Sequence, residues 1–234
     1  MNIAVDAETR PLTLARERFE RIYNTIRDRI CLLEYEPSAR LAEEDLAREF
    51  GVSRTPVRRV LSRLESEGLL ESWHGVGTFV TDVDIHSLAQ VFKLRMELAE
   101  LIGKLDPIPR TNEDLVRVAR IVDRCDVLLE HPEPKAYARL NMDFFQELAA
   151  MIGNAPLREI SERLYYQTAR IWLKSVPHLN LRDEIIVFRR EVADILAAMK
   201  VGDLEAVGFI RRSHISMSVK RMMRFTSDSE DGAE

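Results

Sequence analysis

The sequence lacks the features of a membrane-spanning or secreted protein. No apolar run approaches the roughly 18 residues that a membrane-spanning helix needs. The first residues, MNIAVDAETRPL, contain no basic region followed by an apolar stretch, so we expect no signal peptide. The two cysteines, Cys31 and Cys125, lie far apart and show neither a CxxC spacing nor a metal-site pattern. We therefore expect a cytoplasmic protein with buried free thiols and no membrane partner.

The sequence also lacks a net positive charge and catalytic motifs. It has 34 Lys and Arg against 39 Asp and Glu, a formal net charge of −5 at pH 7. Binding to nucleic acid would therefore depend on a local basic patch. No carboxylate pair, nucleophile–base motif or glycine-rich phosphate loop is present, so we predict no enzymatic activity and no cofactor. A length of 234 residues with 46% hydrophobic residues suits one or two globular domains.

The most informative segment is a predicted helix over 53–67 with two different faces. The apolar face follows the i, i+3, i+4, i+7 rule through Val57, Val60, Leu61 and Leu64. The opposite face is polar and basic and carries Thr55, Arg58, Arg59 and Ser62, with Arg54 and Arg63 at its margins. Such a helix can pack on a small core while its guanidinium groups reach phosphates or guanine bases. Taken alone, the pattern also fits an ordinary solvent-exposed helix.

The residues around this helix favour DNA binding over that ordinary explanation. A short helix is expected over 43–50, Gly51 suits a tight turn, and Ser53 suits an N-cap. An earlier helix over 14–33 would complete a three-helix core. The order of helix, short turn and basic helix is typical of a helix-turn-helix domain.

A glycine-rich hairpin is predicted after the basic helix. Two β-like runs, 69–73 and 78–81, flank the sequence HGVG, whose glycines allow a close approach to a sugar-phosphate backbone. The stretch GVSRTPVRRVL followed by EGLLESWHGVGTFV resembles the winged helix-turn-helix of GntR-type bacterial transcription regulators. The resemblance implies binding to double-stranded DNA, and it covers the basic helix, the turn before it and the wing.

The resemblance also implies which residues contact DNA. They lie at the start of the basic helix and at the wing tip: Ser53, Arg54, Thr55, Arg58, Arg59, His74 and Gly75. Three positions depart from the family pattern. Arg59 stands where the family usually has Glu, which adds a positive charge, and Glu44 stands where a basic phosphate contact is frequent. Ser38 stands where Gly is common, which predicts a strained or altered turn.

The second half of the sequence shows only helical periods, separated by Pro, Gly or Asn. We expect helices over 86–104, 112–130, 134–152, 156–174, 181–200 and 203–224. Thr111 and Asp203 are the expected N-caps of two of them. Helices of this length with short connections predict an antiparallel bundle, so the fold class is mainly α, with a winged helix-turn-helix before an all-α bundle.

The helical half resembles the FCD effector domain of FadR-type GntR regulators. The segments that carry the resemblance are VFKLRMELAELIG, YARLNMDFFQELAAMIGNAPL and EVADILAAMKVGDLEAVGFIRRSHI. We accordingly expect a DNA-binding domain over 12–81, an effector-binding and dimerisation domain over 82–226, and a disordered acidic tail over 227–234. Members of the family act as homodimers on near-palindromic operators, commonly as repressors.

Many FCD domains hold a metal ion with one Asp and three His. In this sequence the corresponding positions are Asn141, Phe145, Val192 and His214, of which only the last is a histidine. Asn is a poor ligand, and Phe and Val provide no donor atom. Nearby Asp143 is two residues from Asn141 and should point to another face. We therefore predict no metal at the family site.

A pocket for an organic effector is the expected replacement. Asn141, Phe145, Val192 and His214 should converge on it, and Arg95 and Arg170 are candidates to pair with an anionic effector such as a carboxylate. The alternative is a filled pocket, in which Phe145 and Val192 act as plugs and the bundle serves only for dimerisation. The sequence leaves both open, together with the identity of the effector and of the operator.

Overall fold

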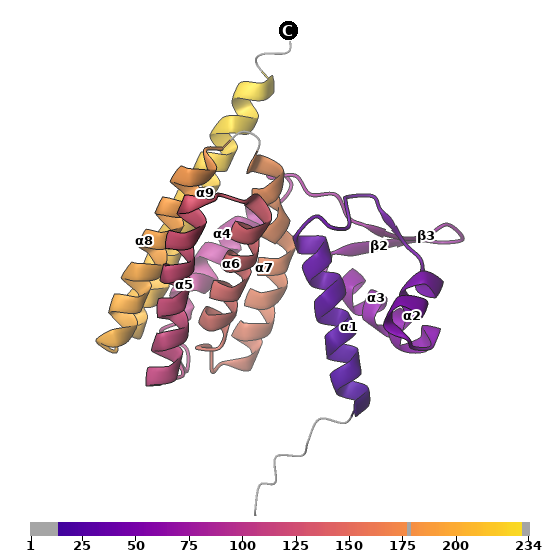
Figure 1. Ribbon diagram of the computed structural model, residues 1–234, viewed down its shortest axis with the longest axis horizontal. Helices are drawn as coiled ribbons and strands as arrows, with labels where there is room; N and C mark the ends of the chain where they lie inside the picture. Colours follow the sequence, from indigo (N-terminus) through magenta and orange to yellow (C-terminus); the bar gives the residue numbers. More distant parts are fainter. Residues whose placement is uncertain (1–13, 177–178, 231–234) are drawn as a thin grey trace, which may run out of the picture.

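The computed structural model describes residues 14–176 and 179–230, with side chains up to residue 223. Figure 1 shows two parts side by side: a smaller N-terminal part with three helices and a β-hairpin, and a C-terminal helical bundle. The architecture is mainly helical, as the sequence predicts. The described part contains no helix that is long and apolar enough to cross a membrane.

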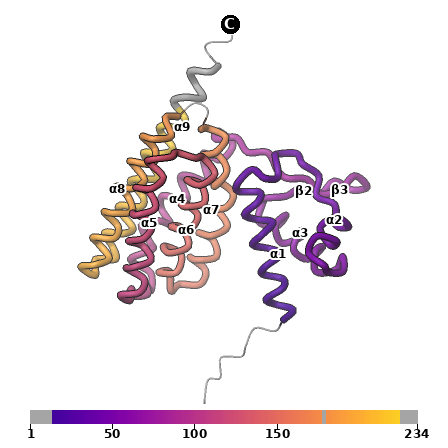
Figure 2. The backbone as a smooth tube through the Cα atoms, in the orientation of Figure 1, coloured from indigo at the N-terminus to yellow at the C-terminus, as the bar shows by residue number. Residues whose placement is uncertain are grey.

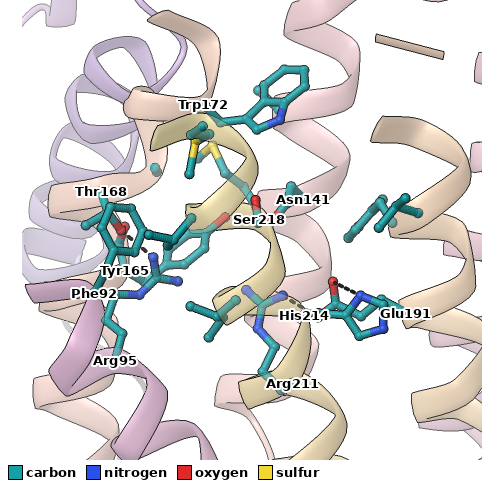
Figure 3. Close-up of a pocket in the computed structure, with 18 of the residues that line it drawn as sticks. Phe92, Arg95, Asn141, Tyr165, Thr168, Trp172, Glu191, Arg211, His214 and Ser218 are labelled. Atoms are coloured by element: carbon teal, nitrogen blue, oxygen red, sulfur yellow. Dashed lines mark hydrogen bonds and ion pairs between the residues drawn. The ribbon is translucent and has the colours of Figure 1, made fainter. Parts of the chain in front are cut away.

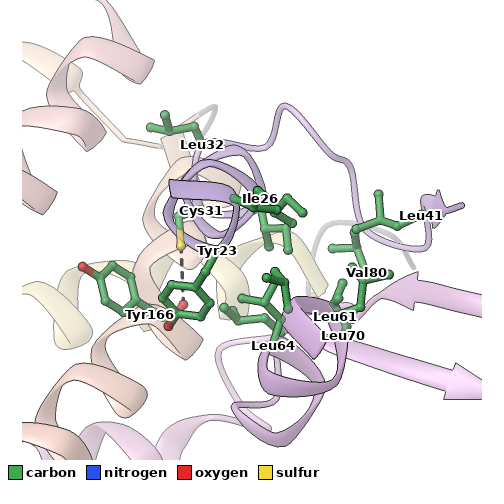
Figure 4. Close-up of a cluster of buried hydrophobic side chains, with 14 of the residues drawn as sticks. Tyr23, Ile26, Cys31, Leu32, Leu41, Leu61, Leu64, Leu70, Val80 and Tyr166 are labelled. Atoms are coloured by element: carbon green, nitrogen blue, oxygen red, sulfur yellow. Dashed lines mark hydrogen bonds between the residues drawn. The ribbon is translucent and has the colours of Figure 1, made fainter. Parts of the chain in front are cut away.

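The N-terminal part is a helical core with a small sheet. Its elements in chain order are α1 (Leu14–Cys31), β1 (Arg40–Leu41), α2 (Glu43–Phe50), α3 (Arg54–Ser66), β2 (Leu70–Trp73) and β3 (Gly77–Val80). The predicted apolar face of α3 is buried, with Val57, Val60 and Leu64 at 0% exposure. Figure 4 shows Leu61, Leu64 and Ile26 meeting in this core.

The sheet has one more strand than the sequence predicts. Its order is β1-β3-β2, all antiparallel, with Arg40 opposite Phe79 and Leu70 opposite Val80. The two-residue strand β1 is too short to give a periodic signal, and it forms because β3 provides a neighbouring edge.

The turns form where the sequence predicts them. Gly51 ends α2 in the left-handed region at φ 64°, and Gly68 ends α3 at φ 79°. Ser38, which stands where the family has Gly, adopts φ 65° and so carries the expected backbone strain. Ser53 occupies the N-cap position of α3 with an extended backbone, but its hydroxyl makes no capping hydrogen bond.

The C-terminal part contains the predicted helices with shifted ends. They are α4 (Ala89–Leu101), α5 (Asn112–Glu130), α6 (Pro134–Ala149), α7 (Ala155–Ser175), α8 (Leu181–Lys200) and α9 (Leu204–Glu230). Thr111 forms a capping box with Asp114, and the Asp203 carboxylate accepts from the amide of Ala206 at 2.9 Å. Helix α9 continues to Glu230, so 227–230 are helical where the sequence predicts a disordered tail. Residues 231–234 of that tail, and the expected domain start at 12, lie outside the described residues.

The bundle helices form a closed ring in which each packs on the next. The order around the ring is α4, α9, α8, α5, α6 and α7, and α7 returns to α4. Because chain neighbours α8 and α9, α5 and α6, and α6 and α7 are adjacent in the ring, short connections suffice. The ring leaves an interior that five of these helices line.

Helix α7 joins the bundle to the N-terminal part. In Figures 1 and 2, α1 and α7 run side by side at the boundary. The Arg27 guanidinium lies 4.0 Å from the centre of the Tyr166 ring, and Cys31 Sγ donates to the Tyr166 carbonyl at 3.8 Å (Figure 4). Tyr165, Tyr166 and Phe145 belong to the same buried cluster as the N-terminal core. The two parts therefore share apolar packing.

Candidate functional site

The predicted DNA-contacting residues of α3 all lie on the exposed side of the helix. Ser53, Arg54, Thr55, Arg58 and Arg59 are exposed, with side-chain exposures of 55% for Arg54 and 64% for Arg58. This follows from the helical period, since the buried stripe at Val57, Val60, Leu61 and Leu64 occupies the opposite side. The arrangement presents a basic face to solvent.

Two of these arginines are paired with acidic residues at the start of α2. Arg58 Nε and Nη2 each donate to the Glu43 carboxylate at 2.9 Å. Arg54 Nη1 donates to Glu44 Oε1 at 2.9 Å. Sequence reasoning noticed Glu44 as a departure from the family but missed Glu43, because the contact joins residues that are 15 apart. The acidic first turn of α2, EED, was the available signal.

The wing tip is exposed and turns sharply. His74 and Gly75 are exposed, and the Val76 amide donates to the Trp73 carbonyl at 3.0 Å to close the turn. Gly75 adopts φ 73°, and a Cβ placed on it would have no atom within 4 Å. The tip is therefore open to a partner such as a nucleic-acid backbone. Trp73, at 60% exposure, lies beside it.

The interior of the bundle holds a cavity of about 90 Å³. Figure 3 shows its lining, to which α4, α6, α7, α8 and α9 contribute Arg95, Asn141, Tyr165, Thr168, Glu191 and His214 among others. Cys31 of α1 also lines the cavity, so the N-terminal part forms one section of its wall.

Arg95 is the cavity group that lacks an acidic partner. Its Nη1 donates to Thr168 Oγ1 at 2.5 Å, and the Tyr165 ring lies 5.2 Å from its guanidinium carbon. No carboxylate of the described residues forms an ion pair with it within 4.0 Å. Burial, with the nearby Arg211 guanidinium, lowers the pKa of Arg95 to about 9. An anion in the cavity would restore the favourable environment for this charge.

A second charged group in the cavity is already balanced. Arg211 Nη1 donates to Glu191 Oε1 at 2.6 Å, and both residues are at most 6% exposed. The other oxygen of Glu191 lies 3.8 Å from His214 Nδ1. Burial, more than any charge, lowers the pKa of His214 below its ordinary value. The imidazole is therefore held in its neutral form at neutral pH.

The structure brings three of the six predicted pocket residues to the cavity and leaves the others outside. Arg95, Asn141 and His214 line it. Phe145 stacks on Tyr165 with ring centres 3.7 Å apart and lines a separate space of about 20 Å³. Val192 is fully buried in the apolar cluster between the bundle helices. Both positions are thus filled by packing.

Arg170 was predicted to line the pocket, but its side chain lies outside the cavity. It follows Thr168 by two residues, which rotates its side chain by roughly 200° around α7 and away from the cavity. Its Nη2 donates to Thr81 Oγ1 at 2.6 Å, at the joint between the two parts. Arg170 is 0% exposed, and its Nε and Nη1 have no hydrogen-bond partner among the described residues.

Sequence reasoning missed Glu191 and Arg211, which supply most of the cavity's buried charge. The signal was present, because Arg211 precedes His214 by three residues on one helix and so shares its face. Glu191 immediately precedes Val192, the position that the family pattern aligned with a metal ligand. In this protein the carboxylate, and not its neighbour, lines the cavity.

The residues at the family's metal position do not fit a divalent ion. Phe145 and Val192 offer no donor atoms, which leaves one amide and one imidazole from Asn141 and His214. Across 14–176 and 179–230, no group of three or more His, Cys, Asp or Glu side chains is placed to hold a metal ion.

Two family models together match most of the chain. The model described as bacterial regulatory proteins, gntR family, matches residues 18–80, and the FCD domain model matches residues 90–217. The chain belongs to the GntR family, in the subgroup with a C-terminal FCD domain. Members of this family are DNA-binding transcriptional regulators and not enzymes, so the exposed basic face and wing belong to a DNA-binding domain.

Several known proteins resemble this chain over most of their length. It is 42% identical over 202 residues to an HTH-type transcriptional regulator in an unstable DNA locus of Streptomyces ambofaciens, covering 83% of this chain and 80% of that protein. It is 22% identical over 213 residues to the HTH-type transcriptional repressor RspR of Escherichia coli, covering 89% of this chain and 92% of that protein. The structure of Escherichia coli McbR/YncC shares the fold, with a TM-score of 0.75, 21% identity, and coverage of 88% of this chain and 97% of that one.

Proposed function

We propose that this GntR regulator is a repressor that binds a near-palindromic operator as a homodimer and is controlled by a small organic anion in the bundle cavity. A relative that is 22% identical, RspR, is named a repressor. Such a protein acts in the cytoplasm, where the bacterial chromosome lies. Two copies of one basic helix match two half-sites of a symmetric operator, one helical turn of DNA apart.

The proposed DNA contacts divide into positioning and recognition. Ser53, Thr55 and the amides at the start of α3 hold phosphates, because the Ser53 hydroxyl is not used as a cap and helix N-termini attract anions. Arg54, Arg58 and Arg59 contact bases or phosphates in the major groove. The wing tip approaches the minor groove through His74 and Gly75.

The observation that carries the effector proposal is the Arg95 guanidinium. This group lines the cavity and forms no ion pair with a carboxylate of the described residues. Burial also destabilises its charged form. A ligand carboxylate would form the charge-assisted pair that the protein itself does not provide. Asn141 and His214, which also line the cavity, offer hydrogen bonds to the rest of the ligand.

The cavity also limits the size of the effector. Its volume of about 90 Å³ is smaller than the roughly 150 Å³ of an apolar cavity that binds benzene. We infer a short carboxylate of fewer than about six non-hydrogen atoms.

A ligand can regulate DNA binding only if its affinity differs between two arrangements of the protein. Helix α7 provides the connection, because Thr168 contacts Arg95 in the cavity while Tyr166 and Arg170 contact the N-terminal part. Cys31 extends this connection by placing α1 in the cavity wall. A ligand bound to Arg95 would therefore change the contacts by which α7 holds the DNA-binding domain against the bundle.

The test is a thermal-shift measurement with a panel of short carboxylates and the matching neutral amides. We expect a carboxylate to raise the melting temperature of the wild type, since a ligand that binds the folded state stabilises it. The rise should vanish in Arg95→Met and persist in Arg124→Met, which removes an arginine paired with Asp143 on the outer surface. An equal rise in Arg95→Met would refute the assignment of Arg95.

A second function remains, in which the bundle serves only for dimerisation. The stacked Phe145 and Tyr165 rings favour it, because they fill the space around the first His position of the family. This alternative would be supported if the protein binds its operator but no member of the panel changes its melting temperature or its operator affinity.

A further inference from the structure

Two consecutive glutamates at the start of α2 contact the basic face of α3 in different ways. Glu43 holds Arg58 through two parallel hydrogen bonds of 2.9 Å, and its Oε2 also lies 3.5 Å from Arg54 Nε. Glu44 makes one contact, to Arg54 Nη1 at 2.9 Å. The Glu43 side chain is 26% exposed and that of Glu44 is 68% exposed. Glu43 is thus the more firmly held of the two.

The two-point contact fixes the orientation of the Arg58 guanidinium. A carboxylate that binds Nε and one Nη nitrogen constrains the plane of the group as well as its position. The pairing holds the pKa of Glu43 below its ordinary value, with the Arg58 hydrogen bond as the largest cause. Arg58 nevertheless remains 64% exposed, so the pairing does not remove it from the surface.

The donors left on Arg58 suit one base. A guanidinium has five N–H donors, and the Glu43 carboxylate uses one on Nε and one on Nη2. The end of the group, with one N–H from each Nη nitrogen, stays free. This edge matches the O6 and N7 acceptors of guanine in the major groove.

We propose that Glu43 is a positioning residue for base recognition, which holds Arg58 so that its free edge meets a guanine of the operator. The proposal rests on the DNA contacts proposed above. Glu43 adds negative charge near the DNA, which weakens binding to every sequence, while the orientation that it imposes strengthens binding to one. Glu44, with a single exposed contact, only reduces the local positive charge.

The test compares Glu43→Gln with Glu44→Gln in the full-length protein, because each removes one carboxylate from the same turn. Selection from a random duplex library with the wild type first defines a preferred duplex. Dissociation constants are then measured for that duplex and for a scrambled duplex of equal composition, at several salt concentrations. Thermal melts confirm that each variant is folded.

We expect Glu43→Gln to bind the scrambled duplex more tightly and to lose about tenfold or more of the preference between the two duplexes, concentrated at one base pair. Glu44→Gln should tighten binding to both duplexes and leave the preference unchanged. Arg58→Lys, which keeps the charge without the two-point geometry, should lose the preference as Glu43→Gln does, and the double variant should lose no more.

Two results would overturn the proposal, and they differ from each other. If Glu43→Gln raises the affinity for both duplexes equally, the carboxylate merely competes with DNA for Arg58. If the wild type selects no preferred duplex, the proposed DNA contacts fail as well, before any variant is compared.

Discussion

Gln167 Nε2 donates a hydrogen bond of 2.7 Å to the main-chain oxygen of Glu67, which directly follows α3. The hydroxyl of the next residue on α7, Thr168, accepts a hydrogen bond from Arg95, which lines the cavity. Consecutive residues of α7 therefore contact the end of α3, which is proposed to bind DNA, and the proposed anion site. The Glu67 carboxylate also accepts from the Tyr23 hydroxyl and from Arg63 Nε, so its side chain is held as well.

Gln167→Ala should uncouple effector from operator. The variant keeps the cavity and the basic face but loses the hydrogen bond to Glu67. We expect the ligand to bind with nearly wild-type affinity while its effect on operator affinity, on the order of tenfold for a typical regulator, largely disappears. Operator titrations with and without ligand measure this. Arg163→Ala, at an exposed position of α7, is the control that should retain the effect.

Arg58→Ala should weaken operator binding by about tenfold or more, since it removes a proposed base contact. The loss should shrink on a scrambled duplex, where only the charge of Arg58 contributes. Gel-shift titrations with both duplexes measure the two effects. Arg124→Ala, on the outer surface of α5, should bind like the wild type. Unchanged operator affinity in Arg58→Ala would contradict the assignment of α3 as the recognition helix.

Arg170→Met should stabilise the protein, whereas Arg211→Met should destabilise it. Both arginines are buried, but Arg211 is paired with Glu191, while Arg170 has only Thr81, and burial lowers its pKa. Replacing an unbalanced buried charge with an apolar side chain of similar length often gains about 1 kcal/mol or more, roughly 2–4 °C in a chain of this size. Removing Arg211 leaves Glu191 as an unpaired buried charge, at a cost of about 3–5 kcal/mol.

Differential scanning calorimetry of the two variants decides this prediction. A fall in melting temperature for Arg170→Met would show that its bond to Thr81, which joins the two parts, outweighs the cost of its burial. Thr81→Val then serves as the check, because it removes the same bond and leaves the guanidinium in place.

His214 should make the protein less stable in mild acid. Its pKa is lowered in the folded state, chiefly by burial, so the unfolded chain binds the proton more readily. This penalty is absent well above the unfolded pKa of about 6.5 and grows as the pH falls through that value. Glu191 and Arg211 face the imidazole and oppose each other, which leaves burial as the dominant cause.

The measurement is the melting temperature from pH 8 to pH 5 for the wild type and for His214→Gln. Other groups titrate in this range and affect both proteins, so the difference between the two curves isolates His214. We expect the wild type to lose more stability than the variant below about pH 6.5. Parallel curves would show that the folded protein protonates His214 without penalty.

The fold was largely predictable because it depends on local periodicity. The buried stripe of α3 fixes one face of the helix, and Thr111 and Asp203 cap their helices through bonds to residues three positions later. Such signals lie within a few residues of one another. Strand β1 was missed because two residues that pair with a distant strand carry no periodic pattern.

The candidate site was less predictable because it depends on the rotation of each helix. Asn141 and His214, which the family pattern marks, line the cavity, but one residue of offset separates Val192 in the core from Glu191 in the cavity wall. Arg170 has a plausible residue type on the right helix and points to the other side of it. The Glu43–Arg58 pair joins two helices, and a sequence reports neither the angle between helices nor the reach of their side chains.

Cys31 belongs to the first helix of the DNA-binding half, yet it lines part of the wall around the proposed effector. Excising the C-terminal half as a separate fragment would open that wall to water and expose Tyr166, which the first helix contacts. Affinities measured on such a fragment would describe a cavity that lacks part of its wall. Ligand screening on this protein calls for the intact polypeptide.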